Sequence, residues 1–172
     1  MPRNYSRATI KLRPRRRDPG VLKKANLKGV ALHWPAMSKK ITTVEQAKTA
    51  LRSYQNFHMD ERVWSDIAYN VAFDQQGNRY KLRGRTKMSA ANGNTTLNKA
   101  YTAILLLLVE GEEPSAAMLK AVRTEITKIR KRNAKAKAIV GHREIRPGGT
   151  ECPGRVVQKA IDADKFEPRK AA

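Results

Sequence analysis

The feature that most constrains the fold is a continuous apolar run near the middle of the chain. Every residue from Ala103 to Val109 is apolar, and the run has the length of a β-strand. It is too short to cross a lipid bilayer. A strand that is apolar on both sides needs a covering layer on each face of its sheet. We therefore predict that Ala100 to Val109 forms a central strand of a sheet flanked by helices.

The other patterned segments alternate between strand and helix types. Further strands are expected at Gly29–Trp34, Ile67–Asp74, Arg79–Leu82 and Ala138–Gly141, with Gly77 in a hairpin turn and a loop at Gly84–Leu97. Helices are expected from a cap at Thr42 or Thr43 to near Asp60, after a cap at Ser115, and from Gly154 to Ala163. This alternation predicts an α/β fold with a central mixed β-sheet, and 172 residues suit a single domain.

The two ends of the chain are expected to lie outside this domain. Residues 1–24 are rich in arginine and lysine and have prolines at positions 14 and 19, which predicts a mobile or loosely docked basic arm. Such an arm is either a solvated tail or a tether for polyanions, and the residues leave both open. We expect the folded domain at residues 25–163 and a polar tail at residues 164–172. The basic N-terminus has no secretory apolar segment, so export by a signal peptide is not expected.

The net charge is +21, which attracts polyanionic partners. Nucleic acids, anionic cell-wall polymers and membrane surfaces would all be attracted by the same field. The basic residues are scattered, and no zinc-finger, helix-turn-helix or RNA-recognition signature accompanies them. A nucleic-acid-binding protein is therefore an alternative, but nucleic acid is not the expected partner.

The segment with the clearest chemical signature follows the last predicted strand. His142 ends this apolar run, and a glycine-rich turn leads to Cys152, the only cysteine of the chain. A single cysteine forms no internal disulfide, which leaves a free thiol, a nucleophile or a metal ligand. Imidazole and thiolate are both preferred ligands of zinc. A cysteine hydrolase with Cys152 as its nucleophile is the alternative.

His33 is the best candidate for a third ligand. It also ends an apolar strand, so both histidines are expected at one rim of the sheet, where sites in α/β proteins are usually built. Three protein ligands and an open position are the arrangement of a catalytic zinc site. His58 is the remaining histidine, and its position in the first helix predicts core packing or a hydrogen bond instead.

Two further residues near this rim could assist hydrolysis. Tyr69 lies in the predicted hairpin and could guide a proton, although a core aromatic residue is the simpler interpretation. Thr150 lies two residues before Cys152 and could donate to an oxyanion, although it could also be an ordinary turn residue.

The sequence resembles the superfamily of peptidoglycan recognition proteins and type 2 N-acetylmuramoyl-L-alanine amidases. The superfamily typically shows an H-x3-GW-x-DI-x-Y-x-F pattern, and the segment from Gln55 to Asn70 is similar to it. Gly77 and the segment Lys81–Arg85 follow in the same order, as does the last motif, Val-Gly-His142 with Thr150–Gly154. Leu32-His33 matches the first zinc ligand, and the resemblance covers about residues 27–160.

The resemblance implies a zinc hydrolase that cleaves the amide between N-acetylmuramic acid and L-alanine. It implies zinc ligation by His33, His142 and Cys152, with Tyr69 orienting or deprotonating water and Thr150 stabilising the oxyanion. Relatives that only bind peptidoglycan commonly lack the cysteine, so Cys152 favours catalysis. A non-catalytic peptidoglycan binder of the same fold is the alternative.

The chain also departs from the typical pattern. Val63 replaces the glycine before the tryptophan, and Ala103 replaces a glycine of the central strand. Asn92 lies in the loop where relatives often have a substrate-facing histidine. We assign Trp34, Asn92 and Arg85 as candidate substrate-binding residues.

The expected partners follow from the implied substrate and from the charge. They are peptidoglycan and, through the basic surface, anionic cell-wall polymers, and the protein is expected to be a monomer. We expect a bacteriophage endolysin that is synthesised in the cytoplasm and acts at the cell wall after release.

Overall fold

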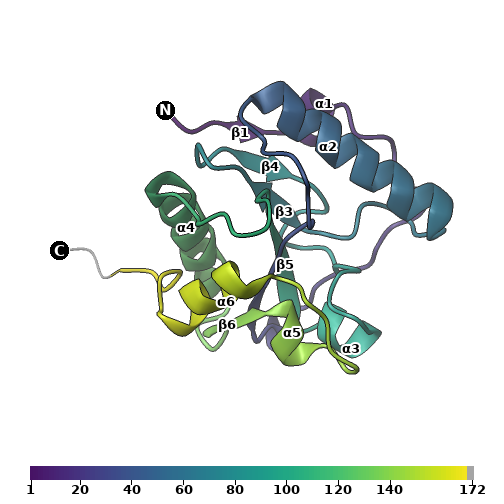
Figure 1. Cartoon of the computed structure of the whole chain (residues 1–172). Helices are drawn as coiled ribbons and strands as arrows, with labels where there is room; N and C mark the ends of the chain where they lie inside the picture. The colour runs from purple at the N-terminus through teal and green to yellow at the C-terminus, as the bar shows by residue number, and fades with distance from the viewer. Residues whose placement is uncertain (170–172) are drawn as a thin grey trace.

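The computed structural model describes residues 1–169 of the chain (Figure 1). Its strands are β1 (Asn4–Tyr5), β2 (Gly29–His33), β3 (Val71–Phe73), β4 (Arg79–Lys81), β5 (Tyr101–Leu106) and β6 (Ala138–Gly141). Its α-helices are α1 (Arg7–Ile10), α2 (Val44–Asn56), α3 (Thr95–Asn98), α4 (Ala116–Arg132), α5 (His142–Ile145) and α6 (Arg155–Asp162). A 3-10 turn, η1 (Lys24–Asn26), and a π-helical turn, η2 (Phe57–Glu61), complete the described elements.

The strands form one sheet in the order β1-β4-β3-β5-β2-β6. Only β3 and β4 are antiparallel, and the other neighbouring strands are parallel. The predicted α/β fold with a mixed sheet is confirmed, and the apolar run at its centre is β5, which lies between β3 and β2. No helix within residues 1–169 is both long and apolar enough to cross a membrane.

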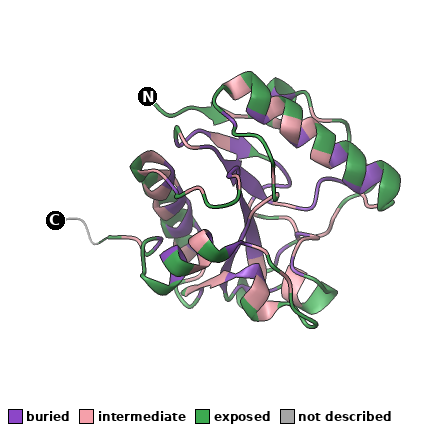
Figure 2. Cartoon of the chain, in the orientation of Figure 1, coloured by how far each residue is buried: buried purple, intermediate pink, exposed green. Residues whose placement is uncertain are grey.

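A separate core fills each side of the sheet (Figure 2). On one face, Met118 and Val122 of α4 pack against Val30 and Leu32 of β2. On the other face, α2 supplies the buried Leu51. Successive side chains of a strand point to opposite faces. His33 therefore points to the α2 face, away from the α4 core.

Local signals in the sequence explain where the two long helices begin. Thr43 caps α2 through a reciprocal pair of bonds with Gln46, whose backbone N–H donates to the Thr43 hydroxyl at 3.2 Å. Ser115 caps α4 by accepting a hydrogen bond from the backbone N–H of Met118 at 3.0 Å. Each cap satisfies a backbone N–H that has no partner within the helix.

The strand predicted from Ile67 to Asp74 is shorter in the structure, where β3 begins at Val71. Asn70, directly before β3, keeps backbone hydrogen bonds to Ala103 and Leu82, and its buried side chain adds further bonds. Its amide nitrogen donates to the carbonyl of Gly84 at 2.8 Å, and its amide oxygen accepts from the backbone N–H of Ala103 at 2.8 Å. Residues 67–70 form a loop next to the sheet.

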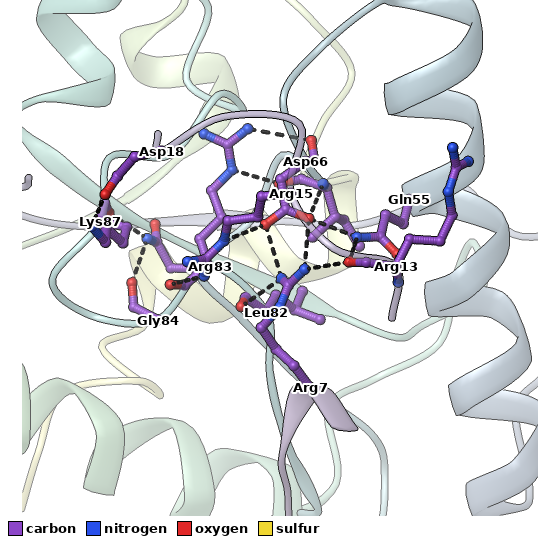
Figure 3. A network of polar contacts seen from close by, with 12 residues as sticks. Arg7, Arg13, Arg15, Asp18, Gln55, Asp66, Leu82, Arg83, Gly84 and Lys87 are labelled. Atoms are coloured by element: carbon purple, nitrogen blue, oxygen red, sulfur yellow. Dashed lines mark hydrogen bonds and ion pairs between the residues drawn. The ribbon is translucent and has the colours of Figure 1, made fainter. Parts of the chain in front are cut away.

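The N-terminal segment packs on the domain and is not a mobile or loosely docked arm. β1 pairs with β4, and Ile10 and Leu22 are completely buried. Ion pairs to Asp66 also hold the segment. This fully buried carboxylate accepts hydrogen bonds from Arg7 at 2.8 Å and from Arg15 at 3.0 Å (Figure 3). Some of the basic residues that predicted an arm, Arg7 and Arg15, therefore form the ion pairs that help to hold this segment in place.

The polar tail expected at residues 164–172 is also partly wrong. Phe166 is completely buried in the core beneath α4, because the chain turns back after α6. Residues 170–172 of this predicted tail lie outside the described residues.

Candidate metal centre

Two parallel strands deliver the two histidines to the same rim. β2 ends at His33, and β6 ends at Gly141, directly before His142. The strands are neighbours, with Leu32 opposite Gly141. Their carboxyl ends therefore meet, and the two imidazole rings lie 4.5 Å apart between centroids.

Cys152 completes the cluster from the loop before α6. The ligand atoms of His33, His142 and Cys152 all lie within 4.8 Å of one another. The Cys152 sulfur is 3.6 Å from Nδ1 of His33. The three side chains thus converge as the sequence predicts, and their zinc ligation stays a prediction.

Asn92 determines which ring nitrogen of the neutral His33 carries the proton. The amide nitrogen of Asn92 donates to the carbonyls of Leu97 at 3.3 Å and Tyr101 at 3.1 Å, so its amide oxygen must face His33. That oxygen lies 3.0 Å from Nε2 of His33, which must donate to it. Nδ1 then carries the free lone pair, and this is the nitrogen that faces the cysteine sulfur.

The surroundings suit a metal ion. Burial lowers the pKa of His33 to about 3, with a smaller contribution from His142, so its imidazole is neutral and able to ligate. Burial likewise lowers the pKa of His142 to about 4. Nε2 of His142 is buried and has no hydrogen-bond partner among residues 1–169. An orphaned buried nitrogen costs free energy that a metal ligand bond would offset, and two imidazoles with one thiolate are a zinc donor set.

The cluster lies at a cleft of about 400 Å³. Tyr69 and Thr150 both line this cleft, and the Tyr69 ring makes an edge contact with His33 at 5.4 Å between centroids. The Thr150 hydroxyl accepts from the backbone N–H of Cys152 at 3.2 Å, which leaves its proton able to donate. Burial, the main effect, and the nearby Cys152 both raise the pKa of Tyr69, so its hydroxyl stays protonated at neutral pH.

The predicted substrate-binding residues have different outcomes. Trp34 lines the cleft, and its contact with substrate stays a prediction. Asn92 is completely buried and bonds to His33, so it positions the His33 ring and is not exposed to the cleft. Arg85 does not line the cleft, and its Nε and Nη2 donate to the carboxylate of Glu125 of α4 at 2.5 and 2.6 Å, so the structure gives no support for a substrate contact. Its side chain is therefore directed to the α4 face.

Several residues that line the cleft were not predicted as site residues. His58 was expected to pack or to form a hydrogen bond, and it does stack on Trp64 at 5.1 Å between centroids, but both also line the cleft. Arg62 and Arg146 bring positive charge to the same cleft. His58 lies in η2, and π-helical turns are frequent at functional sites. No pattern in the sequence predicts such a turn.

The backbone at Val63 has a conformation that glycine, the usual residue of the superfamily at this position, adopts readily. Its φ is +55°, a conformation that is strained for a β-branched residue and free of strain for glycine. The backbone here therefore has the shape that the usual glycine favours. Val63 is 71% exposed and lies between the cleft residues Arg62 and Trp64.

Replacing Asn92 by alanine is expected to weaken zinc binding by about 10- to 100-fold, because His33 loses the partner that fixes its tautomer and ring orientation. Competition titration with a chromophoric chelator measures this change. Asn94→Ala is the matched control, because Asn94 lies in the same loop and caps α3 through its bond to Leu97. Equal zinc affinity in the two variants would contradict the role given to Asn92.

The zinc-free protein is expected to lose stability as the pH falls from about 6.5 toward 4. The pKa of His33 is lowered to about 3, and those of His58 and His142 to about 4, in each case mainly by burial. In this range the unfolded chain binds protons that the folded chain excludes. Each histidine contributes at most about 1.4 kcal/mol per pH unit. Urea unfolding at pH 7 and pH 5 tests this. His58→Gln should reduce the change in the free energy of unfolding between the two pH values. A free energy of unfolding that is equal at both pH values would contradict it.

Comparison with known proteins agrees with this geometry. No protein-family model matches the chain. The chain is 32% identical over 107 residues to the N-acetylmuramoyl-L-alanine amidase of Sus scrofa, covering 60% of this chain and 17% of that protein. It is 31% identical over 115 residues to peptidoglycan-recognition protein SC2 of Drosophila simulans, covering 66% of this chain and 61% of the relative. The matched regions thus span less than two thirds of either relative.

The fold comparison covers almost the whole chain. The structure of wild-type Drosophila PGRP-LB aligns with a TM-score of 0.77 and 25% identity, over 97% of this chain and 96% of that one. The sequence motifs, the mixed sheet and these similarities agree with one another. The relatives and the structural neighbour are peptidoglycan recognition proteins and N-acetylmuramoyl-L-alanine amidases, which supports the assignment of this chain to that superfamily.

Proposed function

We propose that this protein is a zinc-dependent N-acetylmuramoyl-L-alanine amidase, which hydrolyses the amide between N-acetylmuramic acid and L-alanine in peptidoglycan. The observation that carries the proposal is the convergence of His33, His142 and Cys152 within 4.8 Å at a cleft. His33, His142 and Cys152 would hold the ion with three protein ligands, the number found in catalytic zinc sites. Zinc held by these residues would supply Lewis acidity to the scissile amide.

The residues around the cluster have the chemistry that amide hydrolysis requires. The Tyr69 hydroxyl is protonated, which supports a role in donating a hydrogen bond and orienting the reactants, not one as a base. The Thr150 hydroxyl lines the same cleft and could donate to the developing oxyanion. Arg62 and Arg146 would attract the carboxylates of a stem peptide.

The cysteine-hydrolase alternative has weaker support. A nucleophilic cysteine needs a lowered pKa, since the thiolate is the reactive form. Burial raises the pKa of Cys152 to about 11. The neighbouring His33 has a pKa of about 3 and is a poor base for that thiol.

A lytic role at the bacterial cell wall, as in a phage endolysin, is part of the proposal. Its support is the net charge of +21, which would hold the enzyme on anionic walls and make binding sensitive to salt. Turbidity loss of purified walls at low and physiological salt measures this role.

Product analysis separates the amidase from a non-catalytic binder. The protein should release peptides with a free L-alanine amino terminus from peptidoglycan, lose this activity after zinc removal, and regain it with added zinc. Tyr69→Phe should retain zinc and lose about 100-fold or more in turnover, as expected for a removed transition-state donor. Binding to walls without released amino termini would instead identify a binder. Activity that survives complete zinc removal would exclude the metal mechanism.

A further inference from the structure

A second concave surface lies on the α4 face of the sheet. This groove of about 420 Å³, here called the α4 groove, is lined by the N-terminal segment, by the β3–β4 hairpin and by α4. Phe73 lies at its base and is 1% exposed. α4 and α2 cover opposite sides of the sheet (Figure 1), and His33 points to the α2 side. The α4 groove and the cleft at the metal centre therefore lie on opposite faces.

The α4 groove has an excess of positive charge. Glu125 is its one acidic lining residue, and it binds Arg79 at 2.9 Å and Arg85 at 2.5 Å. Burial opposes ionisation of Glu125, but hydrogen bonds from the two arginines outweigh it and hold its pKa below the ordinary value. The single negative charge of Glu125 is therefore paired with two positive charges and cannot neutralise the other cations of the groove.

Three further cations line the α4 groove without a partner. Among residues 1–169, the side chains of Arg3, Lys120 and Lys128 form no ion pair and no hydrogen bond. Lys120 and Lys128 lie on α4 at a spacing of eight residues, which places them about 12 Å apart along the helix. Arg3 lies in the N-terminal segment before β1. The cations are therefore spread along the groove and match a ligand with repeated negative charges.

The residues that line the α4 groove favour a flexible polyanionic chain over a membrane or a nucleic acid. Membrane surfaces are bound by several exposed apolar side chains together. Of the exposed large apolar residues within 1–169, only Met1 adjoins this groove, whereas Val21, Phe57 and Val63 all lie outside it. Single-stranded nucleic acids stack on accessible aromatic rings, and within residues 1–169 the only aromatic residue lining the groove is the buried Phe73. A phosphodiester chain without bases needs neither feature.

We infer that the α4 groove binds a linear phosphodiester polymer of the bacterial cell wall, while the cleft on the α2 face takes peptidoglycan. Occupation of the α4 groove would tether the protein and raise the effective concentration of peptidoglycan at the cleft. The benefit to hydrolysis rests on the proposed function, whereas polymer binding itself requires no zinc and no turnover. Measurements on the zinc-free protein therefore test the groove independently of the amidase.

The test is isothermal titration of zinc-free protein with purified poly(glycerol phosphate) teichoic acid at several salt concentrations. Lys120→Glu/Lys128→Glu should weaken binding by about tenfold or more, and should reduce the dependence of log affinity on log salt by about 2, one for each lost contact. Lys99→Glu/Lys159→Glu is the matched control, because it makes the same change in net charge at exposed positions outside the groove. This control should retain most of the affinity.

Two results would overturn the inference. Equal losses in the two double variants would show that the overall charge, not the groove, binds the polymer. Tighter binding of wild-type protein to oligothymidylate or to phosphatidylglycerol vesicles than to teichoic acid would assign the groove to another class of partner. Thermal unfolding checks that each variant is folded, and Arg3→Glu, at a different element of the same groove, replaces the double variant if that one is not.

Discussion

Replacing His142 by alanine is expected to abolish both zinc retention and wall hydrolysis. The variant keeps only His33 and Cys152, which are too few ligands for a stable zinc site. Loss of a residue that merely supports a ligand costs about 10- to 100-fold in metal affinity, so loss of a ligand should exceed about 100-fold. Metal analysis after dialysis and the release of amino termini from peptidoglycan measure the two effects.

His58→Ala is the matched control for this experiment. His58 lines the same cleft, and its Nδ1 faces the backbone N–H of Ala68 at 3.4 Å, not the metal cluster. The control should therefore retain zinc whatever its activity. Full lysis by His142→Ala would show that the ligand set is wrong, and loss of zinc from both variants would show that the measurement reports general damage to the cleft.

Replacing Asp66 by alanine should give the largest loss of stability. This fully buried carboxylate accepts hydrogen bonds from Arg7, Arg15, Gln55 and the backbone N–H of Ile67 (Figure 3). Removing one partner of a buried charge pair costs about 3–5 kcal/mol, because the other charge is left without compensation. Arg7 and Arg15 are 20% and 26% exposed, so water recovers part of this and the lower end of the range is expected.

Denaturant unfolding measures the loss, and limited trypsin digestion locates it. The N-terminal segment should become more readily cleaved at its arginines, because Asp66 anchors both Arg7 and Arg15 of this segment to the rest of the domain. Asp60→Ala is the control, since Asp60 also pairs with two arginines, Arg13 and Arg16, but at the surface. Surface pairs of this kind contribute little. A change below about 1 kcal/mol for Asp66→Ala would contradict the structural role of the cluster.

Much of the candidate metal centre could be predicted because its three side chains carry local signals. His33 and His142 each follow an apolar strand, and parallel strands bring their carboxyl ends to one rim. Cys152 is the only thiol, so few interpretations were available. The fold class was predictable for a similar reason, since the apolar run that became β5 had to be covered on both faces.

Arg85, Asn92 and the N-terminal arginines were misread because a polar residue gives no sign of its partner. Arg85 pairs with Glu125, which is 40 residues away in the chain. Asn92 reaches His33 across 59 residues, and Arg7 reaches Asp66 across 59 residues. A charge run can be solvated or can be neutralised by a buried carboxylate, and the composition of the run is the same in both cases.

The order of the residues is therefore sufficient to predict the layers of the fold and the three side chains of the candidate metal centre, because burial and strand periodicity depend on the local pattern of apolar residues. The tertiary structure alone decided which nitrogen of His33 faces Cys152, which face holds the cationic groove, and whether residues 1–24 are attached to the domain. Those outcomes depend on hydrogen bonds and ion pairs between distant segments, which exist only after the sheet has brought the segments together.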